Sequence, residues 1–157
     1  MSDIFNFPSL IGDNNIDLSQ YSMREKIELM EWAMFQMAGH VTELPTTHKV
    51  FGGMYVRELT IPEGFVLTGK IHLEDHFCML MKGDLSVMTD EGMKRIQAPC
   101  TFEAKAGIKK IGFAHDDVIF STVHKTNLTD IEEIEKALFV DSDLTWIDKL
   151  MVAICQQ

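Results

Sequence analysis

The middle of the chain is dominated by alternating apolar and polar residues, the pattern of half-buried strands. Between about Val50 and Thr126, short runs rich in branched and aromatic residues are separated by turn residues such as Gly, Pro and Asp. About eight short antiparallel strands in so little chain favour a closed barrel or jelly roll over an open sheet, because closure removes exposed edges. The predicted strands are Met54–Ile61, Phe65–Leu73, Phe77–Met81, Leu85–Thr89, Lys94–Ala98, Thr101–Ala104, Lys109–Ala114 and Val118–His124.

A helix is predicted before the strands. Ser22 and Glu25 have the spacing of a capping box, in which the two side chains satisfy free amides at the start of a helix. Gly39 supplies the stop. We interpret the apolar stripe between them as core packing, with a dimer face as the alternative. The stripe consists of Ile27, Met30, Met34 and Met37.

Two helices are predicted after the strands. Thr129 and Glu132 again have the capping-box spacing, and a last short helix is predicted near the end of the sequence. The apolar positions of the two helices are Ile131, Ile134 and Leu138, then Leu144, Ile147 and Met151. The chain therefore divides into an N-terminal arm and amphipathic helix (1–49), a β-barrel (50–126) and C-terminal helices (127–157). The predicted fold class is mainly β, with helices at both ends.

Charge and cysteine content narrow the functional classes. The 157 residues include 14 basic and 24 acidic side chains, giving a formal charge of -10. Such a chain would repel the phosphate backbone, so generic nucleic-acid binding is not expected. Three cysteines, Cys78, Cys100 and Cys155, make a disulfide framework or zinc ribbon improbable. With neither a signal peptide nor an apolar run long enough to span a membrane, we expect a cytoplasmic protein without a membrane partner.

Histidines are the side chains best suited to chemistry. His72 and His76 share strand parity, so both can face the barrel interior, and His124 shares parity with Val118 and Phe120 on the last strand. Three neutral imidazoles that leave coordination positions open are typical of a catalytic site for zinc, iron, manganese or nickel. The alternative is a group of hydrogen-bonded histidines in a core or pocket. His115, beside a turn, is a further candidate ligand.

The spacing around these histidines resembles the cupin superfamily. Its first motif is glycine, five residues, histidine, one residue, histidine, three or four residues, glutamate, six residues and glycine. Gly64, Lys70, His72, His76 and Gly83 hold these positions, with lysine at the first histidine and histidine at the glutamate. The chain also resembles small cupin-like proteins of bacteriophages. The resemblance implies a cupin-type β-barrel that binds a divalent transition metal. It also implies a homodimer, because cupin relatives are often dimers.

The second cupin motif departs further from the family. Pro99 stands at its first glycine and Lys105 at its proline, while Gly107 fits its second glycine. Lys110 lies at its histidine and Ala114 at its asparagine. With Lys70, two of the four family metal ligands are therefore lysines.

Three hypotheses remain open from the sequence. The first is a metal-binding cupin, with an enzyme as one form of it, in which His72, His76 and His124 are the ligands. The second is a metal-free pocket in which Lys70, Lys110 and His115 bind a small anionic metabolite or nucleotide signal. The third is a structural or interaction protein, with the barrel as a scaffold and the helices as contact faces for a dimer.

Overall fold

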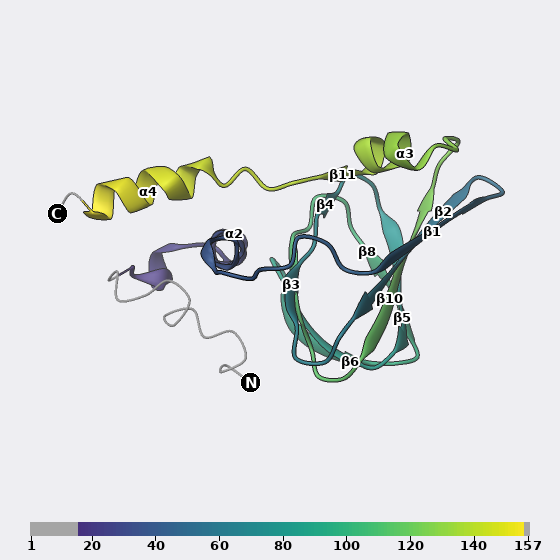
Figure 1. The fold of residues 1–157 in the computed structure, drawn as a ribbon, viewed down its shortest axis with the longest axis horizontal. Coiled ribbons are helices and arrows are strands. Elements are labelled where there is room, and N and C mark those ends of the chain that lie inside the picture. Colours follow the sequence, from purple (N-terminus) through teal and green to yellow (C-terminus); the bar gives the residue numbers. More distant parts are fainter. Residues whose placement is uncertain (1–15, 156–157) are drawn as a thin grey trace.

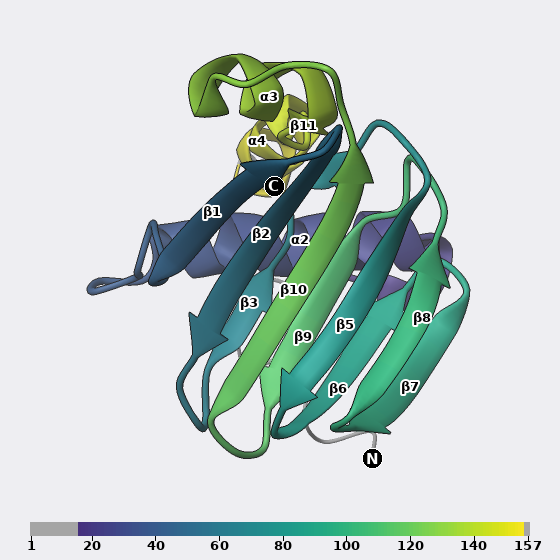
Figure 2. The same cartoon turned by 90° about the vertical axis from the view of Figure 1, so that its right-hand side faces the viewer.

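Two antiparallel sheets face each other at the centre of the molecule. The computed structural model describes residues 16–155. The larger sheet has the strand order β1-β2-β10-β5-β8, the smaller sheet has the order β3-β9-β6-β7, and β4 pairs with β11 at one end (Figures 1 and 2). The strands are β1 (Thr46–Phe51), β2 (Met54–Ile61), β3 (Val66–Thr68), β4 (Ile71–His72), β5 (His76–Lys82), β6 (Asp84–Thr89), β7 (Gly92–Gln97), β8 (Cys100–Ala104), β9 (Lys110–Ala114), β10 (Val118–Lys125) and β11 (Phe139–Val140).

The predicted fold class is confirmed: the structure is a mainly β barrel of antiparallel strands with helices at both ends. Two differences concern individual strands. The predicted strand Phe65–Leu73 is wrong as one unit, because the chain leaves the sheet at Gly69 and Lys70 between β3 and β4. Strand β1 was not predicted, because most of its residues are polar and it lies at the edge of its sheet.

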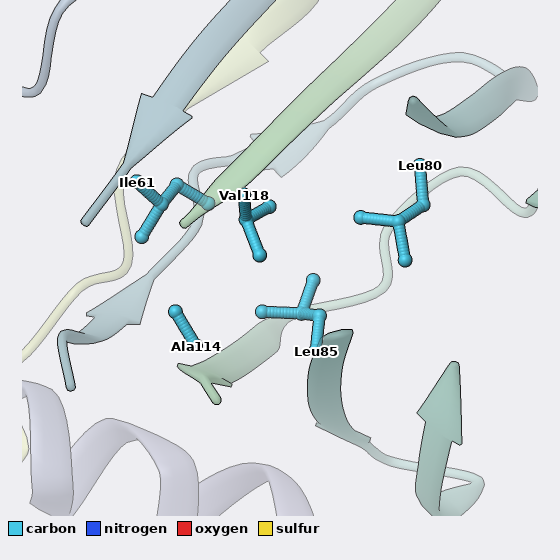
Figure 3. Packing of buried hydrophobic residues seen from close by; sticks show 5 residues of the cluster. All are labelled: Ile61, Leu80, Leu85, Ala114 and Val118. Atoms are coloured by element: carbon cyan, nitrogen blue, oxygen red, sulfur yellow. The ribbon is translucent and has the colours of Figure 1, made fainter. Parts of the chain in front are cut away.

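Apolar side chains from both sheets meet inside the barrel at the end away from β4. Leu80 of the larger sheet and Leu85 of the smaller sheet are almost fully buried there, together with Ile61, Ala114 and Val118 (Figure 3). Gly83 lets β5 turn sharply into β6. It has φ +91, and a Cβ atom there would lie 2.5 Å from the carbonyl oxygen of Asp117. This cluster closes the end of the barrel away from β4.

Helix α2 (Met23–Gln36) covers the outer face of the smaller sheet. The predicted capping box is confirmed, since Glu25 N–H donates to Ser22 Oγ and Ser22 N–H donates to Glu25 Oε2. Ile27 and Met30 are buried against Met88 and Ile111, with Met34 partly buried beside them. These contacts bear out core packing for that part of the stripe. Met37, in contrast, is 52% exposed.

The C-terminal helices lie over different parts of the molecule (Figure 1). Helix α3 (Ile131–Leu138) and β11 cover the end of the barrel that carries β4, whereas α4 (Thr145–Cys155) packs on α2 through Ile147 and Leu29. The capping box predicted at Thr129 is wrong, because the N-cap residue is Asp130, whose side chain accepts from Glu133 N–H. A carboxylate caps a helix as well as a hydroxyl does, and its charge also suits the helix N-terminus. No helix within residues 16–155 is long and apolar enough to cross a membrane.

Candidate metal centre

Three buried histidines come together at the end of the barrel that α3 and β11 cover. His72 ends β4, His76 begins β5 and His124 lies near the end of β10. They are 8%, 6% and 1% exposed. One ring nitrogen of each lies within 4.8 Å of the others. The sequence parity argument therefore predicted their common location, although residues 73–75 leave the sheet between the first two.

The three rings form a compact triangle, because the centroids of His72 and His124 are also only 5.0 Å apart. The ring centroids of His72 and His76 are 4.1 Å apart, and those of His76 and His124 are 4.6 Å apart. Phe139 of β11 meets His72 edge-on at 4.7 Å and His124 at 5.4 Å. Because β11 is hydrogen-bonded in register with β4, the C-terminal segment holds this aromatic wall against the histidines. Tyr55 completes the wall, with its hydroxyl 2.8 Å from His48 Nδ1.

Hydrogen bonds fix one imidazole and leave two ring nitrogens free. His76 Nδ1 lies 3.0 Å from the carbonyl oxygen of Glu74, so Nδ1 carries the proton and Nε2 has the lone pair. His72 Nδ1 and His124 Nε2 share a hydrogen bond of 3.2 Å. Among the described residues, His76 Nε2 and His124 Nδ1 are buried without any hydrogen-bond partner. Buried polar atoms are rarely left so, which indicates a missing partner at this point.

Burial also keeps the imidazoles neutral. It lowers the pKa of His72 to about 2 and that of His124 to about 4, reinforced in both by the charges of His76 and Lys110. Burial lowers the pKa of His76 as well. Neutral imidazole is the form that binds metals. The three side chains therefore fit a divalent transition metal in chemistry, in proximity and in the free ring nitrogens.

A small cavity lies inside the barrel next to His72. Its volume is about 80 Å³, and its wall is mostly apolar. The polar side chains at its wall come from Arg57, Lys70, His72, Lys110 and Thr122. The sequence reasoning did not single out Arg57 and Thr122. Their strand parity was a usable signal, since Arg57 shares parity with Tyr55 and Leu59, and Thr122 shares parity with Phe120 and His124.

The other predicted ligand residues lie in three different places. Lys110 is half-buried at the cavity, and its charge reaches all three histidines. The Lys70 side chain borders the cavity but is 51% exposed and lies 3.9 Å from Asp141. His115 precedes β10, whose length separates it from His124, and its Nε2 is 2.8 Å from Ser86 Oγ. Lys110 alone of these three therefore combines burial with proximity to the histidines.

Comparison with known proteins supports the fold. The sequence matches no protein-family model and no curated protein. Ectoine synthase from P. lautus is similar in structure with a TM-score of 0.50, at 12% identity, covering 66% of this chain and 80% of the synthase. KdgF from Halomonas sp. aligns with a TM-score of 0.49 at 12% identity, over 62% of this chain and 93% of its own.

A cupin-2 domain containing protein from Shewanella frigidimarina aligns with a TM-score of 0.44 at 10% identity, over 71% of this chain and 95% of its own. At such low identities the likeness concerns the fold and not the activity. Any statement about what this chain binds must therefore come from its own residues.

Proposed function

We propose that this protein binds a divalent transition metal through His72, His76 and His124, inside a cupin-type barrel that admits a small molecule. The observation that carries the proposal is the buried cluster of three neutral imidazoles, two of which have ring nitrogens without a partner in the described part of the chain. A core packed only for stability would cover these nitrogens or replace them with apolar atoms, because each uncompensated polar group costs about 1–3 kcal/mol.

The contact that His76 makes through its other ring nitrogen supports the same proposal. Metal-binding histidines usually donate their other ring N–H to a carbonyl or carboxylate, which sets the tautomer and the orientation of the ring. His76 makes this contact with Glu74. The hydrogen bond between His72 and His124 must be exchanged for metal bonds, since one of these rings uses a lone pair in it.

An all-imidazole donor set suits zinc, iron or nickel, and manganese is the fourth metal we consider. A metal held by three protein ligands keeps positions for water or substrate and acts as a Lewis acid. Within this proposal we therefore favour the hypothesis that the protein is an enzyme. Ectoine synthase, an enzyme by its name, has the same type of fold. The homodimer, the cytoplasmic location and the phage origin stay predictions.

Elemental analysis of protein purified without chelator tests the proposal. We expect about one equivalent of a first-row transition metal per wild-type chain, and far less in His76→Ala. His40→Ala is the matched control, because His40 is an exposed histidine outside the barrel. If wild-type protein and His76→Ala retain the same trace of metal, even after incubation with zinc, iron(II), manganese and nickel salts, the proposal is wrong.

A further inference from the structure

Two consecutive lysines, Lys109 just before β9 and Lys110 at its first position, have opposite environments. Lys109 is 1% exposed, and its ammonium lies 2.6 Å from Glu31 Oε1 on α2. Lys110 points the other way, as alternate residues of a strand do, and lines the cavity. Within residues 16–155, Lys110 forms no salt bridge. The fold thus neutralises the lysine buried beneath α2 with a carboxylate of that helix and leaves the other lysine facing the cavity.

The larger sheet contributes two more polar groups without a hydrogen bond. Arg57 of β2, Thr122 of β10 and Cys78 of β5 are register neighbours, so they lie in one row on the inner face. Arg57 Nε and Thr122 Oγ1 are both buried, and neither has a hydrogen-bond partner in the described part of the chain. Glu135 lies 3.5 Å from Arg57 Nε as an ion pair. Thr122 has no such compensation.

The apolar wall of the cavity makes Lys110 and Thr122 destabilising unless a ligand pairs with their polar atoms. Phe102, Phe120 and Leu59 belong to the apolar part of the cavity wall. A cation in such a setting loses hydration, and burial accordingly lowers the pKa of Lys110. An anion inside the cavity would replace the lost hydration of the ammonium and accept from the threonine hydroxyl.

We propose that the cavity binds the carboxylate group of a small ligand, with Lys110 Nζ and Thr122 Oγ1 as donors and Arg57 supplying positive charge beside them. This inference deepens the proposed function and rests on it for one point, that the bound carboxylate is a substrate next to the metal. Binding of the carboxylate itself depends only on residues outside the three histidines.

The size of the cavity limits the ligand. A volume of about 80 Å³ is well below the roughly 300 Å³ at which pockets for drug-sized molecules begin, and a liquid water molecule takes about 30 Å³. Formate and acetate are therefore suitable probes. A nucleotide, one of the anions considered from the sequence, is too large for this cavity.

The test is thermal unfolding of chelator-treated, metal-free protein. Acetate is titrated against chloride at constant ionic strength, with acetamide as the uncharged molecule of the same shape. We expect acetate, but not acetamide, to raise the melting temperature saturably. Lys110→Met should weaken the apparent acetate affinity at least about tenfold, because charged hydrogen bonds are the stronger ones. Lys94→Met, on the exposed side of β7, should leave it unchanged.

Thr122→Val keeps the side-chain shape and is the second variant, should Lys110→Met fold poorly. It should weaken acetate binding severalfold. Equal effects of acetate and chloride on the wild type, or an acetate effect that persists in both variants, would overturn the inference. Because no metal is present, such a result leaves the proposed metal site standing. Conversely, if the protein binds no metal, the acetate result still holds, because it is measured on metal-free protein.

Discussion

Acidification should destabilise the metal-free protein through its buried histidines. In the unfolded chain a histidine titrates near pH 6.5, whereas in the folded protein the pKa of His72 is lowered to about 2 and that of His124 to about 4. Between these values the unfolded state binds more protons than the folded state. Stability is therefore complete above about pH 6.5 and falls as the pH is lowered towards the folded-state pKa values.

The expected loss can be worked out for each ring. At pH 5, a histidine that is neutral in the folded state and charged in the unfolded state lowers the free energy of unfolding by about 2 kcal/mol. Each pH unit below 6.5 contributes about 1.4 kcal/mol. His72 and His124 together should therefore lower the free energy of unfolding by about 4 kcal/mol between pH 7 and pH 5. The lowered pKa of His76 acts in the same direction.

Urea unfolding at the two pH values, with chelator present, measures this loss. His72→Gln removes one titrating ring and should reduce the pH-dependent loss by about 2 kcal/mol. His40→Gln replaces an exposed histidine and should leave the loss unchanged. An equal pH-dependent loss in the wild type and His72→Gln would refute the argument that burial keeps this ring neutral.

Three substitutions test the framework around the site. Glu31→Ala should destabilise by about 3–5 kcal/mol in chemical denaturation, because it leaves Lys109 buried without a counter-charge, and adding Lys109→Met should recover most of this. Leu80→Ala, at a fully buried position, should cost about 2–5 kcal/mol in the same assay. Gly83→Ala should lower the melting temperature more than Gly39→Ala. Both glycines have positive φ, but only at position 83 does a Cβ meet a backbone oxygen, 2.5 Å away. Equal shifts would contradict the steric argument.

The alternation of apolar and polar residues predicted most of the barrel, because a strand with one buried face shows this alternation in its own sequence. Met54–Ile61 was predicted to the residue, and Lys109–Ala114 to within one. The pattern failed for a strand with few buried residues and for a very short strand. Strand β1 lies at a sheet edge with few buried residues, and β11 is two residues long. Such elements are fixed by their tertiary partners and not by their own sequence.

The candidate site shows the same division. Parity predicted His72, His76 and His124 on the interior side, and all three are buried, although His72 and His76 belong to two separate strands. Parity failed for Lys70, because Gly69 and Lys70 lie in the break between β3 and β4, where alternation has no meaning. The proximity of Arg57 and Thr122 to Lys110 depends on how the two sheets face each other, which no local pattern encodes.

A calorimetric titration of the metal-free protein with zinc tests the central claim most directly. We predict one saturable site per chain, weakened at least about 100-fold in His72→Ala, His76→Ala and His124→Ala, because each change removes one of three ligands. His40→Ala should bind as the wild type does. Binding that survives in all three barrel variants, or a wild-type chain that binds no zinc, would contradict the account.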